Sequence, residues 1–333
     1  MKIIALEEHI VSRPISKATA AAVASAYPYA ETFLHPAAAD MPDVAQLFSL
    51  GEQRIAIMDK AGIDMEVVSY TNASQWLTGP DAASLTAQAN TDMASAIRPY
   101  PAHFRAFATL PWADPQAAVA ELKRCVGELG FVGALISGRP GTGPVFLDDP
   151  RFEPVWQAFC ELDVPLYIHP NFTCKEVCAA YYSGLGDQVD TIVSAYGWGW
   201  HVEAGIQVLR LILAGVFERF PGLKIISGHW GEVLPYYLTR LDQMLSPAVT
   251  GLPQTISAYY KNHVWITPSG VWDYDCLEYC LKKVGIDHLL YSTDFPYLAE
   301  KGARAFLEDA PLTDEEKVQF GSTNAEKLLH IGL

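Results

Sequence analysis

Eight short apolar runs recur along the chain, and stretches with helical periodicity lie between them. Most of the runs are almost continuously apolar, which indicates strands buried on both faces, as in a parallel sheet. Eight repeats of strand and helix predict closure of that sheet into a (β/α)₈ TIM barrel. We therefore expect a single α/β barrel domain over residues 1–333. The eight runs are Ile3–His9, Asp64–Tyr70, Phe104–Leu110, Val132–Ser137, Val164–His169, Leu223–His229, His263–Pro268 and His288–Asp294.

Two connections in this pattern are too long for simple turns. Val11–Ser49 follows the first strand and Pro170–His201 follows the fifth, and both carry aromatic residues. Long rim loops are typical of lids and pocket walls, although surface irregularity or a subunit contact would explain them equally well. The predicted helices are Glu52–Ala61, Asp81–Ile97, Pro115–Leu129, Pro150–Leu162, Glu203–Phe220, Glu232–Met244 and Tyr274–Val284, and Thr313 and Glu316 are spaced as a capping box.

Ionisable residues stand at the ends of the first, fifth, sixth and eighth runs. A parallel barrel carries its active site at the carboxyl ends of its strands, so these side chains are expected on one rim. Carboxylates and imidazoles that converge there are ligands for a divalent cation. The sequence therefore predicts a metalloenzyme. The residues are Glu7, His9, His169, His229 and Asp294.

The first strand gives the sharpest prediction of side-chain direction. Glu7 and His9 are two residues apart and face the same side, whereas Glu8 faces the helices. A carboxylate and an imidazole inside a barrel are costly to bury unless they are paired or bound to a metal. The eighth strand neighbours the first, so Asp294 comes close as a ligand, an acid or base, or both. For His9, a hydrogen-bonded core histidine is the alternative.

The sixth strand ends in the segment that runs from Ser227 to Glu232. The carboxylate of Glu232 begins a helix and is placed to orient the His229 ring, as in a base with its orienting group. Arg240 follows about two helical turns later. It is a candidate clamp for a substrate carboxylate, and a structural salt bridge explains it equally well.

The acidic composition excludes some classes of partner. The formal net charge is −15, which repels nucleic acid and anionic lipid, so we expect neither as a partner. An anionic substrate would need a local cation, such as a metal or an Arg. Six scattered cysteines fit reduced thiols. No apolar run approaches the length of a signal peptide or a membrane-spanning helix, so a cytoplasmic location is expected.

Four motifs in this order resemble a known family, the amidohydrolase-related metal-dependent decarboxylases. Its members include the γ-resorcylate, 2,3-dihydroxybenzoate and 5-carboxyvanillate decarboxylases, and the resemblance runs from the first strand to the last helix. Hydrolytic amidohydrolases open instead with His-x-His and often carry a Lys on the fourth strand, and both features are missing in this chain. Those departures favour one metal ion over two. The motifs are Glu7-Glu8-His9, Ile168-His169-Pro170, Gly228-His229-Trp-Gly-Glu232 and Ser292-Thr-Asp294-Phe-Pro296.

The resemblance implies non-oxidative decarboxylation of a hydroxybenzoate, or the reverse carboxylation, by a homodimer or homotetramer. Asp294 would deliver a proton, with His229 and Glu232 as the supporting acid and base. Mixed nitrogen and oxygen ligands favour zinc, with manganese a close rival. Some members have Ala where this chain has His9, which leaves open whether His9 binds the metal directly. The implied metal ligands are Glu7, His9, His169 and Asp294, and the expected substrate contacts are Arg240, Phe33, Trp198, Trp200 and His201, with His35 as a weaker candidate.

Two other functions fit the same residues. A metal-dependent hydrolase of a lactone, ester or amide would use metal-activated water and an aspartate base. A non-catalytic barrel that serves as a binding or assembly subunit is the third reading. The intact ligand set argues against that last reading.

Overall fold

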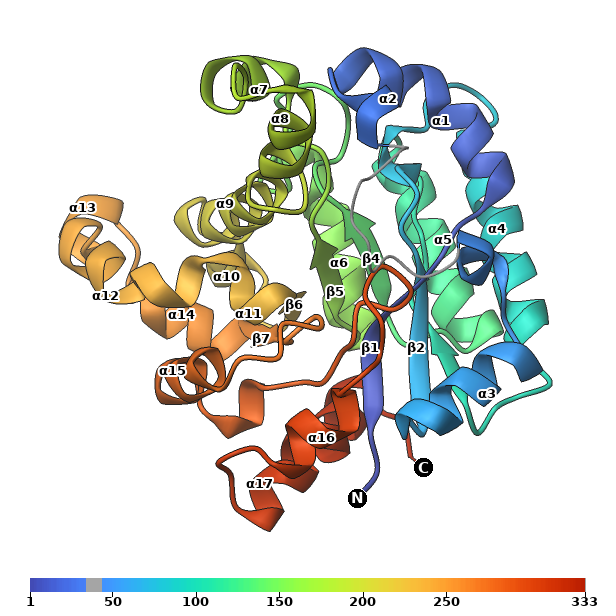
Figure 1. Ribbon diagram of the computed structural model, residues 1–333. Helices are drawn as coiled ribbons and strands as arrows, with labels where there is room; N and C mark the ends of the chain where they lie inside the picture. Colours follow the sequence, from blue (N-terminus) through green and yellow to red (C-terminus); the bar gives the residue numbers. More distant parts are fainter. Residues whose placement is uncertain (34–43, 333) are drawn as a thin grey trace.

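The computed structural model describes residues 1–33 and 44–332 and contains the expected parallel barrel (Figure 1). Seven strands pair in parallel in two sheets, with the orders β1-β2-β3 and β4-β5-β6-β7. Except for β1, the strands are shorter than the apolar runs, because several runs begin or end in turns. The strands are β1 (Ile4–Ile10), β2 (Met65–Tyr70), β3 (Phe104–Ala106), β4 (Ala134–Ser137), β5 (Leu166–His169), β6 (Ile225–Ser227) and β7 (Val264–Ile266).

Single bridges join the two sheets and close the barrel. Ala108 pairs with Ala134 between β3 and β4, and Leu289 pairs with Ile266 of β7. Tyr291 then pairs with Ala5 of β1. The eighth predicted strand is thus reduced to two bridges, because a 3₁₀ turn, η4 (Ile286–His288), leads directly into it. The barrel still closes, so the eighth run delivers Asp294 beside β1 as predicted.

A bulge in β1 controls which of its side chains enter the barrel. The register between β1 and β2 shifts between Ala5 and Glu8. Leu6 packs in the apolar cluster that also contains Tyr167, and Glu7 accepts a hydrogen bond from the Tyr167 hydroxyl. Two successive residues therefore face inward, which a bulge permits and a regular strand does not.

Helices cover the outside of the barrel (Figure 1). The predicted bounds of α3, α5 and α15 are confirmed to the residue, and the capping box of Thr313 with Glu316 is present. The main covering helices are α3 (Glu52–Ala61), α4 (Ala82–Ile97), α5 (Pro115–Leu129), α6 (Glu153–Leu162), α9 (Gly199–Leu213), α12 (Leu234–Met244), α14 (Ile256–His263) and α15 (Tyr274–Val284). Shorter helices are α10 (Val216–Arg219), α13 (Pro247–Thr250), α16 (Ala303–Glu308), α17 (Asp314–Val318) and α18 (Asn324–Leu329).

The described residues of the long connections after β1 and β5 are largely helical, which the sequence analysis did not predict. The first contains α1 (Arg13–Ala26), where Ser12 caps the helix and alanines, the best helix formers, fill its middle. The helix predicted to begin at Glu203 begins at Gly199 and ends at Leu213. The other helices of these connections are α2 (Ala30–Phe33), α7 (Lys175–Tyr181) and α8 (Asp187–Ser194), and the short α11 (His229–Glu232) follows β6.

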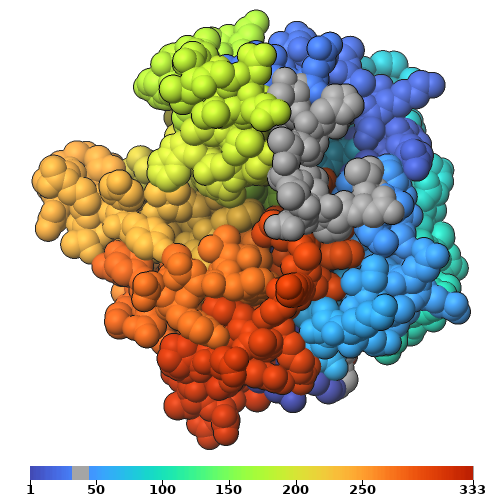
Figure 2. All heavy atoms as spheres, in the orientation of Figure 1, coloured from blue at the N-terminus to red at the C-terminus, as the bar shows by residue number. Residues whose placement is uncertain are grey.

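These two rim segments pack on each other. The Tyr27 hydroxyl donates to the Thr191 carbonyl at 3.1 Å, and its ring stacks on Phe172 with 4.2 Å between centroids. Figure 2 shows the two segments, blue and yellow-green, at the same end of the molecule. The role of these connections as pocket walls stays a prediction.

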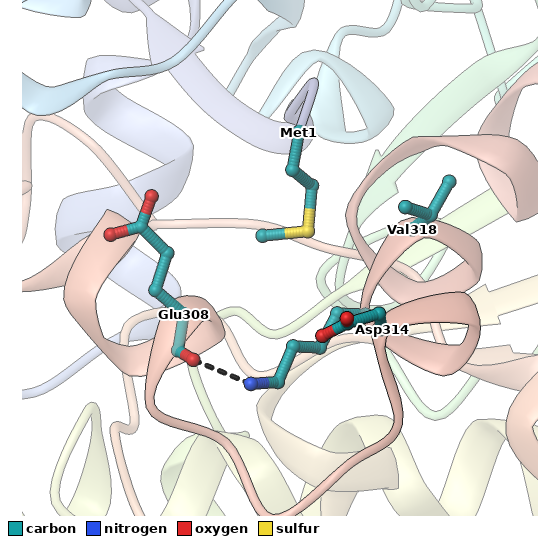
Figure 3. Close-up of a pocket in the computed structure, with 5 residues that line it drawn as sticks. Met1, Glu308, Asp314 and Val318 are labelled. Carbon is teal, nitrogen blue, oxygen red and sulfur yellow. Dashed lines mark hydrogen bonds between the residues drawn. The ribbon is translucent and has the colours of Figure 1, made fainter.

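A small hollow of about 230 Å³ lies between Met1, Glu308 and α17 (Figure 3), where Lys317 donates to the Glu308 carbonyl. It is remote from the carboxyl ends of the strands. The six cysteines are free thiols, as predicted. Among the described residues, no helix combines the length and apolar character needed to cross a membrane.

Candidate active site

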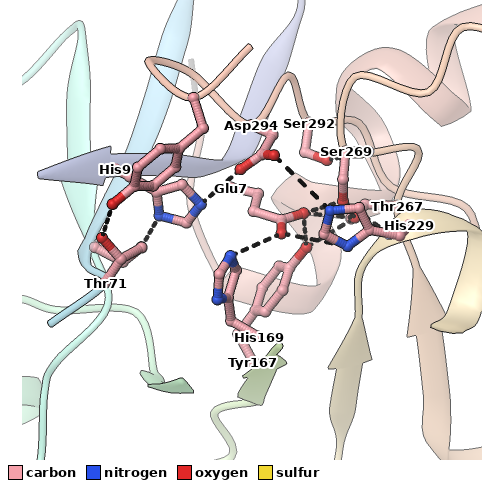
Figure 4. A network of polar contacts seen from close by, with 12 residues as sticks. Glu7, His9, Thr71, Tyr167, His169, His229, Thr267, Ser269, Ser292 and Asp294 are labelled. Carbon is pink, nitrogen blue, oxygen red and sulfur yellow. Dashed lines mark hydrogen bonds and ion pairs between the residues drawn. The ribbon is translucent and has the colours of Figure 1, made fainter. Parts of the chain in front are cut away.

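Side chains from β1, β5 and the end of the eighth run meet at one mouth of the barrel (Figure 4). Glu7, His9, His169 and Asp294 each contribute an atom of a metal-binding type, and these four atoms lie within 4.8 Å of one another. Glu7 Oε1 is 3.5 Å from His169 Nε2, and His9 Nε2 is 3.1 Å from Asp294 Oδ1. The structure thus brings together the four residues predicted as ligands.

The chemistry of these atoms fits a divalent cation. Glu7 Oε1, His9 Nε2 and Asp294 Oδ1 are buried, and their close neighbours in the described part of the chain are histidine nitrogens and carboxylate oxygens of the same site. Buried polar atoms that lack a full set of hydrogen bonds are rare unless another species completes them. Burial and the adjacent His9 hold the pKa of His169 well below its usual value. That keeps the ring neutral, which is the form that binds a metal.

The second carboxylate oxygen of Glu7 is fixed by hydroxyl groups. The Tyr167 hydroxyl donates to Oε2 at 2.5 Å, Thr267 at 3.3 Å, and Ser269 also donates. A Cβ atom at Gly228 would lie 2.9 Å from Glu7, so only glycine fits beside the carboxylate. The sequence analysis missed these supports. The position of Tyr167 could have been predicted from the sequence, because it is two residues before His169 on β5 and its side chain therefore points to the same face.

His229 bridges the ligand cluster and Glu232. Its Nε2 lies 3.8 Å from Asp294 Oδ2, and its Nδ1 lies 2.7 Å from Glu232 Oε1. Burial alone would lower the pKa of His229, but the charges of Glu232 and Glu7 raise it well above its usual value. The backbone of His229 has a positive φ, in the left-handed region. Its N–H donates a hydrogen bond to the Ser269 hydroxyl at 2.8 Å. The predicted pair of His229 and Glu232 is therefore in place.

Glu232 has a second histidine neighbour. His201 Nδ1 lies 2.8 Å from Glu232 Oε2, and the Glu232 side chain is completely buried. Burial opposes ionisation of Glu232, but the charges and hydrogen bonds of His229 and His201 lower its pKa. His201 was predicted to contact substrate. It lies against Glu232 and also borders the pocket that Trp198 and His229 line, so direct contact with substrate stays a prediction.

Two of the aromatic residues predicted to bind substrate lie near this pair. Trp198 is 48% exposed and, with His229, Tyr236 and Val271, lines a pocket of about 400 Å³. Trp200 packs against the rim, and its Nε1 donates to His201 Nε2 at 3.1 Å. Direct contact of either indole with substrate stays a prediction.

The other predicted substrate contacts are not brought to the site by described atoms. Arg240 lies exposed on α12 and forms no hydrogen bond or ion pair within residues 1–33 and 44–332. Phe33 ends α2, but its side chain lies outside the described part of the structure. His35 is also outside the described residues. Their roles stay predictions.

Behind β1, on the helix side, lies a second group of buried carboxylates, which the sequence analysis did not identify. Glu8 points there, as predicted, and accepts hydrogen bonds from Thr293 N–H at 2.9 Å and its hydroxyl at 2.8 Å. Glu66 pairs with Arg54, whose guanidinium also donates to the His9 carbonyl at 2.9 Å. Glu300 completes the group and is 5% exposed. Arg54 thereby ties α3 to the strand that carries the ligands.

Replacing Glu300 by Gln should stabilise the protein at alkaline pH. Neither Glu300 oxygen is hydrogen-bonded within the described residues, and burial, followed by the charge of Glu66, raises its pKa from 4.5 to about 8. Because the folded state holds this proton more tightly than the unfolded state, stability falls from about pH 5 to about pH 8. Gln cannot titrate, so the free energy of unfolding of the variant should gain up to roughly 5 kcal/mol over that of the native protein across that range.

Urea unfolding at several pH values measures this difference. Equal pH slopes for the native protein and the Glu300→Gln variant would show that Glu300 is not protonated in the folded state. The exposed Glu308→Gln on α16 is a matched control and should leave the slope unchanged.

Comparison with known proteins places the chain in a family. The amidohydrolase family model matches residues 18–331. A curated relative, the decarboxylase orsB of Emericella nidulans, is 36% identical over 338 residues, covering 99% of this chain and 97% of the relative.

Solved structures give the same result. 5-Carboxyvanillate decarboxylase from Novosphingobium aromaticivorans, complexed with manganese and 4-hydroxy-3-methoxy-5-nitrobenzoic acid, superposes with a TM-score of 0.88 and 31% identity. That match covers 99% of this chain and 96% of the other. A dihydroxybenzoic acid decarboxylase from Polaromonas, with bound manganese and the inhibitor 2-nitroresorcinol, has a TM-score of 0.85 and 29% identity over 99% and 97% of the two chains. The chain belongs to the amidohydrolase family, in the group of metal-dependent decarboxylases.

Proposed function

We propose that the protein is a metal-dependent, non-oxidative decarboxylase of a hydroxybenzoate-type acid. The observation that carries this proposal is the set of four converging ligand atoms from Glu7, His9, His169 and Asp294. Relatives that are named as decarboxylases of aromatic acids support the choice of reaction. The global negative charge repels an anionic substrate, so a local cation at this mouth is needed for binding.

The ligand side chains hold one divalent ion in this proposal. Such an ion neutralises the substrate carboxylate and an adjacent hydroxyl and thereby fixes the ring. Glu7 is the best-anchored ligand, because three hydroxyl groups hold its other oxygen. His9 is oriented by Ser69, whose hydroxyl lies 3.2 Å from its Nδ1.

Asp294 and His229 carry out the proton transfer. Asp294 delivers a proton to the ring carbon that bears the carboxylate. His229 Nε2, 3.8 Å from Asp294 Oδ2, resupplies that proton, and Glu232 balances its charge. The carbon–carbon bond then breaks, its electron pair restores the aromatic ring, and CO₂ leaves. The overall change replaces carboxylate by hydrogen, so no oxidant is required.

The proposal also concerns which metal ion binds and how many subunits assemble. Mixed ligands led us to rank zinc ahead of manganese, and the comparisons do not support that order, since the two related structures hold manganese. Manganese is therefore the first ion to test. A homodimer or homotetramer, a cytoplasmic location and a single domain stay predictions.

Release of CO₂ from a panel of ortho-hydroxybenzoates tests the proposal. Protein loaded with manganese or zinc is assayed against that panel and against esters, lactones and amides. Turnover of at least one hydroxybenzoate, without faster hydrolysis, is the expected result. Hydrolysis without CO₂ release would overturn the decarboxylase in favour of the hydrolase, and loss of metal binding altogether would favour a non-catalytic barrel.

A further inference from the structure

The buried carboxylate of Glu232 lies between two imidazoles that come from different parts of the chain. Its Oε1 lies 2.7 Å from His229 Nδ1 and its Oε2 lies 2.8 Å from His201 Nδ1. An ionised carboxylate only accepts hydrogen bonds, so both Nδ1 atoms donate to it. The two rings lie 4.4 Å apart between centroids. His201, Glu232 and His229 thus form one continuous polar chain that ends beside Asp294.

The helix that carries His201 is fixed against this turn. A Cβ atom at Gly205 of α9 would collide with the Glu232 backbone carbonyl, so the missing side chain allows close packing. Further along the same helix, Glu203 forms a buried ion pair with Arg139, and Gln207 accepts the Leu147 N–H at 3.1 Å. The helix holds His201 rigidly, which is what an orienting group requires.

Both ring nitrogens of His201 are engaged by the protein. Its Nδ1 faces Glu232, and its Nε2 lies 2.9 Å from the Tyr196 carbonyl and 3.1 Å from Trp200 Nε1. A neutral ring accepts from the indole at Nε2, and a protonated ring donates to the carbonyl. No ring nitrogen is left over for a substrate.

We propose that His201 is a positioning residue of the decarboxylation site: through Glu232 it fixes the tautomer and direction of the His229 ring. With Oε2 held by His201, Oε1 stays on His229 Nδ1, and the His229 Nε2 faces Asp294. Without His201, the completely buried carboxylate loses one donor and can rotate away from His229. This inference rests on the proposed function, because His229 matters as the group that resupplies the proton.

Two substitutions at His201 separate positioning from substrate binding. His201→Ala removes the donor, and His201→Asn restores an N–H near the position of Nδ1. We expect kcat to fall about 10–100-fold in the Ala variant, the range for loss of an orienting hydrogen bond, with KM nearly unchanged. The Asn variant should recover most of that loss. A rise in KM at unchanged kcat would overturn the proposal and make His201 a substrate contact.

A double-mutant cycle with Glu232 tests the connection itself. If His201 acts through Glu232, His201→Ala has little further effect in a Glu232→Gln background, because coupled residues are not additive. Additive losses in kcat would contradict the proposal. Metal content is measured in each variant, and it should stay equal to that of the native protein.

A spectroscopic readout keeps this inference separate from the proposed function. In zinc-loaded protein with isotope-labelled histidine, we expect hydrogen-bonded Nδ1–H signals for both His201 and His229, because zinc is diamagnetic and does not broaden them. The His229 signal should shift or broaden in His201→Ala and persist in His201→Asn. An unchanged His229 signal in the Ala variant would overturn the positioning role. If the His229 signal shifts in His201→Ala but the native protein releases no CO₂, the hydrogen-bond chain is confirmed and the decarboxylase function is rejected.

Discussion

Replacing Asp294 by Asn should lower kcat for CO₂ release by about 10³-fold, within the range typical of a lost general acid. Asn has the size of Asp but cannot deliver or accept a proton. Asp294 is also the ligand whose two oxygens face different histidines: Oδ1 lies 3.1 Å from His9 Nε2, and Oδ2 lies 3.8 Å from His229 Nε2. Steady-state kinetics on the best substrate of the hydroxybenzoate panel measures the effect.

The matched control for this substitution is Asp92→Asn, which makes the same change at an exposed position on α4. It should leave kcat and metal content unchanged. A native rate in Asp294→Asn would remove Asp294 from the proton transfer. A loss of turnover that disappears on saturation with metal would limit its role to binding the ion.

The second large effect is expected from two neighbouring glutamates. Glu7→Gln should weaken metal binding at least about 100-fold, since removing a ligand costs no less than removing a group that orients one. Glu8→Gln should leave metal binding unchanged. Glu7 Oε1 faces His169 at 3.5 Å, whereas Glu8 accepts hydrogen bonds from Thr293 on the opposite side of β1. The same chemical change at adjacent positions thus has opposite consequences.

Titration of metal-free protein with manganese measures both affinities. Loss of binding in Glu8→Gln, with native binding in Glu7→Gln, would mean that the strand faces the other way. Circular dichroism of both variants checks folding, because each substitution is in a buried strand.

The site was largely predictable because its residues follow simple rules of strand geometry. Glu7 and His9 share a face through the two-residue repeat, and Pro170 marks the end of β5 directly after His169. Asp294 follows the run that must lie beside β1 if a barrel closes. These statements depend only on local pattern and on closure, and the structure confirms the resulting cluster.

Other parts of the site depend on contacts between distant segments. The bond between His201 and Glu232 joins residues 31 positions apart, and the hydroxyls of Thr267 and Ser269 reach Glu7 across the barrel. No spacing in the sequence signals such pairs. A strict alternation of inward and outward side chains also fails to predict the bulge that turns both Leu6 and Glu7 inward.

The rim helices were missed for a different reason. The segment Arg13–Ala26 is rich in alanine, and Ser12 with Pro14 is a good helix start, so its local propensity was clear. The length of the connection and its aromatic residues favoured the interpretation as a rim loop instead. In α8, the acidic first turn gave a similar signal of helix formation.

Diffraction from manganese-soaked crystals, recorded at an energy where manganese scatters anomalously, tests the central claim most directly. The account predicts one strong anomalous peak per chain, about 2.0–2.2 Å from Glu7, His169 and Asp294, as in transition-metal sites with such ligands. Those three residues belong to the cluster whose atoms already lie within 4.8 Å of one another. A peak elsewhere, or no peak at this mouth of the barrel, would contradict the account.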